Sequence, residues 1–237
     1  MNSLRVCWLS AGVSSFIAGY LANKENKVDK FIYIENQHPD SIRFINDCSK
    51  VLESPVEILK SSYGSKENVI RTFRFINSPY GAKCTEVLKK RVRKEWELEY
   101  KDFDITYIWG FDSNEIKRAE RLEQSMPEYK HEFPLINYGL TKEKAHGLCQ
   151  LLGIKRPIMY DMGYNNNNCI GCVKGGMGYW NKIRVDFPEA FNEMAKIERE
   201  VGHSCIKGVF LDELDPGRGR ADKEILSDCS IACELSI

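Results

Sequence analysis

Residues 10–15, which read Ser-Ala-Gly-Val-Ser-Ser, have the composition of a turn that could bind an anion. They follow the apolar run Leu4–Leu9, which is typical of a buried strand, and precede residues 16–21, where apolar side chains recur at helical spacing. The N–H groups at a helix N-terminus and the serine hydroxyls are donors, and the helix dipole favours negative charge there. Gly12 would let the backbone approach a ligand closely. The pattern predicts a phosphate-binding turn, although a serine that only caps the helix would leave the same signature.

The cysteines carry the second chemical signal. Cys169 and Cys172 form a Cys-x-x-Cys pair flanked by glycine, and two thiolates at that spacing can chelate one metal ion. The same pair could be redox-active or could be two ordinary thiols, so further ligands decide between these interpretations. Cys84, Cys229 and Cys233 are candidates, and Cys169, Cys172, Cys229 and Cys233 together have the look of a closed zinc site. The remaining cysteines are expected to be small buried residues: Cys7, Cys48, Cys149 and Cys205.

A third stretch, Gly110–Arg118, combines a flexible glycine with charged side chains. The glycine stands at a predicted strand end, Asp112 is a possible helix cap, and Glu115 and Arg118 lie one helical turn apart. The simplest interpretation is a capped surface helix whose ion pair contributes about 0.2–0.5 kcal/mol.

The elements that position these residues alternate between strand and helix along the first 157 residues. Residues 10–15, Glu35 and Gly110 each follow a predicted strand, so we expect them to face one crevice at the carboxyl ends of the strands. Repeated strand–helix units favour an α/β fold, a mostly parallel, twisted, Rossmann-like sheet with helices on both faces. The predicted strands are 4–9, 31–34, 56–59, 104–109 and 132–136, and the predicted helices include 40–53, 67–76, 85–100, 115–126 and 141–152.

The strand rhythm ends after Pro157. We therefore divide the chain into an α/β region, residues 1–157, and a helical, cysteine-bearing C-terminal extension, residues 158–237, packed on the same domain. Within the extension, apolar residues at helical spacing predict a packing helix over 188–201.

Composition argues for a cytoplasmic protein that does not enter a membrane. The 237 residues carry 34 basic and 34 acidic side chains, so the overall charge points to neither nucleic acid nor a lipid surface. No apolar run approaches the length that spans a bilayer, and the N-terminus lacks a signal-peptide layout. In such a chain, nine cysteines are expected to be free thiols or metal ligands rather than disulfides.

Residues 10–15 also resemble a known phosphate-binding loop. Ser10, Gly12 and Ser15 match the Ser-Gly-Gly-x-Asp-Ser pyrophosphate loop of the adenine nucleotide alpha hydrolase superfamily. Ala11 stands where that loop has a glycine, and Ser14 stands where it has the aspartate.

Other stretches are similar to the phosphoadenylylsulfate reductase-like family of that superfamily. The spacing of Gly110, Glu115 and Arg118 matches its Gly-x-x-x-x-Glu-x-x-Arg signature. Further matches are Pro157-x-x-Tyr160-x-x-Gly163, the Cys-Ile-Gly-Cys of residues 169–172, and residues 178–184.

This resemblance implies an enzyme that binds ATP and Mg²⁺ and adenylylates a substrate with release of pyrophosphate. The acceptor would be tRNA, DNA or a small molecule, and a sulfur donor would complete a thiolation. The basic residues 89–94 would either follow such a nucleic acid or form an ordinary solvated face. Arg118 would hold phosphate or sulfate, oriented by Glu115. The implied nucleotide site comprises Ser10, Ala11, Gly12, Val13, Ser14, Ser15, Glu35 and Gly110.

The resemblance also implies a metal centre and two alternative functions. An iron–sulfur cluster would be held by Cys84, Cys169 and Cys172, with the fourth ligand from Cys229 or Cys233, and zinc is the other candidate. The first alternative is a sulfonucleotide reductase that uses Cys229 as nucleophile together with a thiol reductant. The second is a nucleotide-binding protein that has lost the chemistry.

Overall fold

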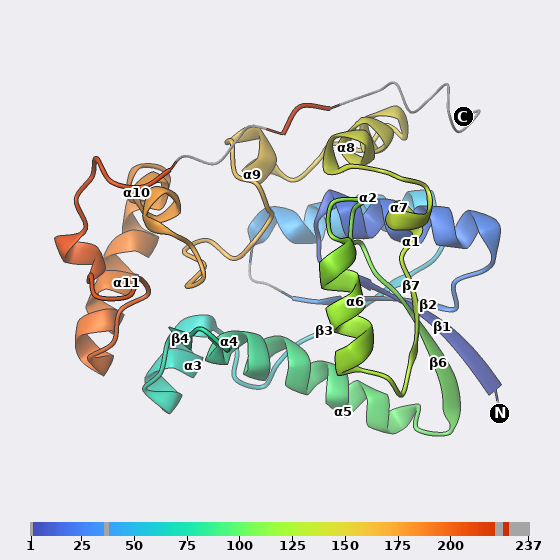
Figure 1. The fold of residues 1–237 in the computed structure, drawn as a ribbon, viewed down its shortest axis with the longest axis horizontal. Coiled ribbons are helices and arrows are strands. Elements are labelled where there is room, and N and C mark those ends of the chain that lie inside the picture. Colours follow the sequence, from blue (N-terminus) through green and yellow to red (C-terminus); the bar gives the residue numbers. More distant parts are fainter. Residues whose placement is uncertain (1, 36–37, 221–224, 228–237) are drawn as a thin grey trace.

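The computed structural model describes residues 2–35, 38–220 and 225–227 (Figure 1). Within them, five short segments pair as one parallel sheet in the order β3-β2-β1-β6-β7, so the α/β class with a parallel sheet is confirmed. The strands are β1 (Asn2–Leu9), β2 (Lys30–Ile34), β3 (Val56–Leu59), β6 (Phe103–Ile108) and β7 (Lys130–Glu132).

The strand order reverses beside β1. The chain runs outward from β1 through β2 to β3, and it then returns to the other side of β1 to add β6 and β7. Cys7 of β1 pairs with Ile108 of β6, so these two strands end side by side. In parallel sheets the crevice at such a switch point is where ligands bind. The turns that follow β1 and β6 are the two that the sequence singled out.

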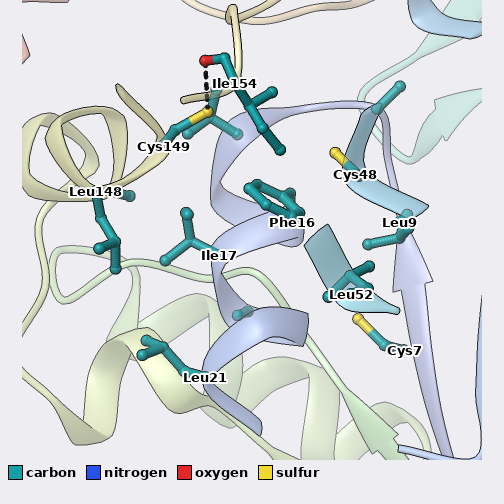
Figure 2. Packing of buried hydrophobic residues seen from close by; sticks show 14 of the residues in the cluster. Cys7, Leu9, Phe16, Ile17, Leu21, Cys48, Leu52, Leu148, Cys149 and Ile154 are labelled. Carbon is teal, nitrogen blue, oxygen red and sulfur yellow. Dashed lines mark hydrogen bonds between the residues drawn. The ribbon is translucent and has the colours of Figure 1, made fainter. Parts of the chain in front are cut away.

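Side chains alternate between the two faces of the central strand, as the period of a strand requires. Cys7 and Leu9 join a core with Phe16 and Ile17 of α1 (Val13–Glu25). Figure 2 shows side chains of α2 (Pro39–Leu52) and α8 (Lys142–Leu151) around them. Val6 and Trp8 point to the other face, where the Trp8 ring meets that of Trp96 on α5 edge-on at 5.5 Å. The helices on the first face are α1 (Val13–Glu25), α2 (Pro39–Leu52), α7 (Pro134–Asn137) and α8 (Lys142–Leu151); those on the second are α5 (Arg91–Glu99) and α6 (Ile116–Ser125).

A separate hydrophobic core lies beside the sheet, at the left of Figure 1. Trp180 is its largest fully buried side chain, and it draws residues from both sides of residue 157, including Ile70, Ile76 and Phe191. Its elements are α3 (Lys66–Phe73), the hairpin β4 (Asn77–Ser78) and β5 (Gly81–Ala82), α4 (Lys83–Thr85), α9 (Ile158–Asp161), α10 (Met177–Asp186), α11 (Pro188–Val201) and a 3-10 helix (Leu211–Glu213).

Two predicted elements differ from the structure by more than a few residues at their ends. The predicted strand 132–136 is wrong over most of its length, because β7 ends at Glu132 and Pro134 begins α7. Proline cannot donate to a strand ladder, and its fixed φ suits the first turn of a helix. The predicted helix 85–100 is interrupted by a π-helical turn, Glu86–Lys90, between α4 and α5.

The predicted extension contains helices α9 to α11, and α11 has the predicted bounds. Cys229 and Cys233 lie outside the described residues. None of the helices in the described part of the chain has the length and apolar character needed to cross a membrane.

Candidate functional site

The main chain turns sharply between the end of β1 and the start of α1. Ala11 adopts a left-handed conformation with φ of 55°, and Gly12, the residue that caps α1, is extended with φ of −105°. Left-handed backbone normally costs an L-residue about 1–2 kcal/mol, so the surrounding contacts must hold Ala11 in place. Ser10 is exposed and Ser14 is half-buried, whereas Ala11, Gly12 and Val13 are buried.

The Ser15 hydroxyl holds this turn together from inside. The main-chain N–H of Ser10 donates to Ser15 Oγ at 2.9 Å, and Ser15 Oγ donates to the carbonyl of Gly12 at 2.9 Å. Ser10 Oγ lies 3.0 Å from the same hydroxyl. Among the described residues, the N–H groups of Gly12 and Ser14 donate to no acceptor. These two amides and the Ser10 hydroxyl are therefore the donors that an anion could use.

A segment from beyond residue 157 lies over this turn. Asn167 is 5% exposed, and its side-chain N–H₂ donates to the carbonyl of Ala11 at 2.7 Å and to Ser41 Oγ of α2 at 3.0 Å. The hydroxyl of buried Tyr160 lies 3.1 Å from where a Cβ on Gly12 would be. Burial raises the pKa of Tyr160 to about 12. Gly12 therefore gives room to a side chain of the same protein, and the sequence carried no signal for the role of Asn167.

Lys142 at the start of α8 brings a positive charge to the same segment. Its Nζ donates to Asn166 Oδ1 at 3.0 Å and to the carbonyl of Asn165, and it lies 5.9 Å from the centre of the Tyr160 ring. This lysine carries no signal in the sequence, because a lysine in the first turn of a helix is ordinarily a solvated charge.

Gly110, at the end of β6, packs directly against the turn. A Cβ there would lie 2.4 Å from the Cα of Ser15, 2.5 Å from its N and 2.8 Å from the carbonyl carbon of Ser14. Only glycine permits this approach. Asp112, two residues further, is 7% exposed and accepts the N–H of Asn114 at 2.8 Å, and burial raises the pKa of its carboxyl group.

Glu115 and Arg118 form the predicted ion pair, with 2.6 Å between Glu115 Oε1 and Arg118 Nη1. Arg118 is 62% exposed along its side chain and stacks on the Phe111 ring at 4.5 Å. Within the described residues, neither side chain hydrogen-bonds to residues 10–15, so their role toward an oxyanion stays a prediction. The carboxylate of Glu35 forms an ion pair with Lys60, with 2.8 Å between Glu35 Oε2 and Lys60 Nζ.

Three of the predicted metal ligands, Cys84, Cys169 and Cys172, come near one another beside the core that contains Trp180. Burial raises the pKa of the Cys84 thiol, and the neighbouring Cys172 and Cys169 raise it further. The hydroxyl of Tyr179 accepts the N–H of Cys172 at 2.8 Å and donates to the carbonyl of Cys169 at 3.2 Å, which fixes the turn between them. Burial raises the pKa of the Cys169 thiol, and Lys89 of the π-helical turn opposes that rise.

Cys205 lies near Cys172 as well. The side-chain N–H₂ of Asn77 donates to the carbonyl of Val173 at 2.6 Å and to that of Cys205 at 3.1 Å, which ties Cys205 to the residue after Cys172. Cys205 is 7% exposed, and Cys7, Cys48 and Cys149 are also buried, so this expectation is confirmed.

The side chains of the described residues do not form a metal-binding site by themselves. Among the described residues, no three His, Cys, Asp or Glu side chains converge closely enough to hold a metal ion. The remaining predicted ligand, Cys233, and the predicted nucleophile, Cys229, lie outside those residues, so the iron–sulfur or zinc site stays a prediction. A cavity of about 220 Å³ opens beside Cys172 and Lys174.

No family model matches the chain, and no curated protein matches it either. The family resemblance therefore rests on the sequence motifs alone.

Proposed function

We propose that the protein binds ATP at the carboxyl ends of β1 and β6 and uses it to adenylylate an acceptor. The observation that carries this proposal is the meeting of the Ser10–Ser15 turn and Gly110 at the point where the strand order reverses. That crevice is the usual ligand position in a parallel sheet of this kind. The donors of the turn, the amides of Gly12 and Ser14 and the Ser10 hydroxyl, suit phosphate oxygens.

In the proposed reaction, an oxygen of the acceptor attacks the α-phosphorus of ATP, and the bond to pyrophosphate breaks. A sulfur or nitrogen nucleophile then displaces AMP from the activated acceptor. Mg²⁺ enters as the metal complex of ATP and offsets the charge of the departing phosphates. The chain's part is to bind and orient the triphosphate, and no step is assigned to a metal cluster. A nucleic acid or a small molecule would serve as acceptor.

The proposal is tested by titrating the protein with Mg-ATP in a calorimeter and by measuring pyrophosphate release with bulk tRNA, DNA or no acceptor. Ser10→Ala removes an exposed hydroxyl of the turn, so we expect about tenfold weaker ATP binding. Ser125→Ala, which changes an exposed serine on α6, is the matched control and should bind like the natural protein. Absence of ATP binding in the natural protein would overturn the proposal.

Two other outcomes favour the alternatives. Sulfite release from adenylyl sulfate in the presence of a thiol reductant would favour a sulfonucleotide reductase. ATP binding without pyrophosphate release over the whole acceptor panel would favour a nucleotide-binding protein without this chemistry.

A further inference from the structure

We propose that Asn167 is the residue that positions the phosphate-binding turn, so that the segment leading into Cys169 and Cys172 sets the affinity for nucleotide. This inference rests on the proposed function and deepens it. The juxtaposition behind it is specific: one buried side-chain amide joins Ala11 of the turn, Ser41 of α2 and a segment 156 residues away along the chain from Ala11.

Asn167 fixes the direction of a single peptide unit, the one that joins Ala11 to Gly12. Asn167 Nδ2 lies 2.7 Å from the carbonyl oxygen of Ala11, so this carbonyl points toward Asn167. In a planar trans peptide, the following N–H points the opposite way. Holding the Ala11 carbonyl therefore aims the N–H of Gly12 away from Asn167. This N–H is one of the two turn amides that donate to no acceptor among the described residues.

The turn needs this contact to keep its conformation. Ala11 is in the left-handed region with φ of 55°, which an alanine leaves readily unless neighbouring groups fix it. The Ser15 hydroxyl fixes the turn on the side of Ser10 and Gly12. Asn167 supplies the contact to the carbonyl of Ala11. Without it, the Ala11–Gly12 peptide could rotate and turn its N–H away from a phosphate.

Asn167 and the residues beside it are held from two sides, by α2 and by α8. Its second bond, to Ser41 Oγ at 3.0 Å, anchors it on α2. Lys142 binds the adjacent residues through the carbonyl of Asn165 and the side chain of Asn166. The amide is thus presented by a segment fixed to α2 and α8, which is the arrangement expected of a positioning group.

The test compares Asn167→Asp and Asn167→Ala with Asn168→Asp. Aspartate keeps the shape of asparagine but cannot donate to the Ala11 carbonyl when ionised, and alanine removes the donor without adding a charge. Asn168 is exposed, so its variant is a matched amide-to-carboxylate control. Alanine keeps the test decisive if the buried aspartate prevents folding.

Two measurements are made. Hydrogen exchange of the peptide covering residues 10–16, without nucleotide, should become faster in both Asn167 variants, while exchange in β2 and β6 stays as in the natural protein. Mg-ATP binding should weaken about tenfold in these variants and stay unchanged in Asn168→Asp.

The inference is overturned if folded Asn167→Ala shows natural exchange over residues 10–16, or if it binds Mg-ATP as tightly as the natural protein. Faster exchange throughout the sheet would also overturn it, because that result describes a general loss of structure. If the natural protein binds no Mg-ATP, the proposed function fails, and the exchange result still decides whether Asn167 positions the turn.

Discussion

Gly110 is the residue at which a single added carbon should do the most harm near the proposed site. In Gly110→Ala the new Cβ would lie 2.4–2.8 Å from main-chain atoms of Ser14 and Ser15, and main chain cannot rotate away as a side-chain tip can. We expect the free energy of unfolding to fall by about 1–3 kcal/mol and ATP binding to weaken with it. Urea unfolding and calorimetry measure the two effects.

Gly217→Ala is the matched control for that substitution. Gly217 is exposed, and the nearest atom to an added Cβ is the Asp215 side-chain oxygen at 3.4 Å, an ordinary contact. Its unfolding free energy should change by no more than about 0.5 kcal/mol. Equal stabilities of the two variants would mean that β6 does not press on the turn as the structure describes.

His146 should make the protein sensitive to mild acid. It is 1% exposed, and burial, with help from Arg156 and Lys142, lowers the pKa of its imidazole to about 3. In the unfolded chain this imidazole binds a proton near pH 6.5, whereas in the folded protein it binds one only near pH 3. Stability from this group is therefore complete above pH 6.5 and declines as the pH falls, by about 1.4 kcal/mol per pH unit.

His146→Gln removes that titration while keeping a polar side chain. Between pH 6.5 and 4.5 its unfolding free energy should fall less steeply than that of the natural protein, by the slope of about one proton. His203→Gln, at an exposed position, serves as control and should follow the natural curve. Parallel curves for all three proteins would contradict the burial of a neutral imidazole.

At the scale of elements, the end of α2 offers a gain in stability. Glu53 follows the helix with φ of 49° and ψ of 33°, a left-handed conformation that favours glycine, and the residue is exposed. Glu53→Gly should raise the free energy of unfolding by about 0.5–1 kcal/mol, because relief of backbone strain exceeds the entropy that glycine loses. Glu53→Ala keeps the strain, so urea unfolding should show no comparable gain for it.

Most elements could be predicted because local pattern and burial agree in them. β3 and α11 have their predicted bounds: β3 is a short, mostly apolar run that follows Ser54 and Pro55, and α11 combines a clear helical period with a proline at its start. β7 could not be predicted well: it is a short edge strand, and the apolar residues after it belong to α7. The π-helical turn Glu86–Lys90 leaves no local mark, because the same residues would suit an unbroken α-helix.

The site was predictable in its local parts and unpredictable where it depends on tertiary contact. The turn after β1 and Gly110 were identified because a strand end, small residues and a helix start are sequence features. Asn167 and Tyr160 reach that turn across the fold, and nothing in a run of asparagines specifies such a contact. Cys205 was expected to be buried, but its proximity to Val173 through Asn77 depends on packing of distant segments.

At the scale of the whole molecule, two of the hydrophobic cores combine residues from both parts of the chain. The core beside the sheet combines Ile70, Ile76 and Ala82 with residues from Met159 to Leu214. The core under α1 takes Tyr160 and Ile225 from the C-terminal part. Asp40 of α2 joins the two parts at their boundary, since its carboxylate accepts the N–H of Ile158 at 2.7 Å while it pairs with Arg43.

This arrangement predicts that a fragment of residues 1–157 will not fold as an independent unit. Ile70 and Ile76 would lose their cover, and each fully buried isoleucine contributes about 2 kcal/mol. Ala11 and Gly12 would also lose Asn167 and Tyr160, so the turn of residues 10–15 would be released even if the sheet formed. We expect the fragment to bind a hydrophobic dye and to unfold at lower urea than a chain of residues 1–227, which keeps every described segment. A fragment that unfolds cooperatively at the same urea concentration and still binds Mg-ATP would show that the C-terminal part is dispensable for both the core and the turn.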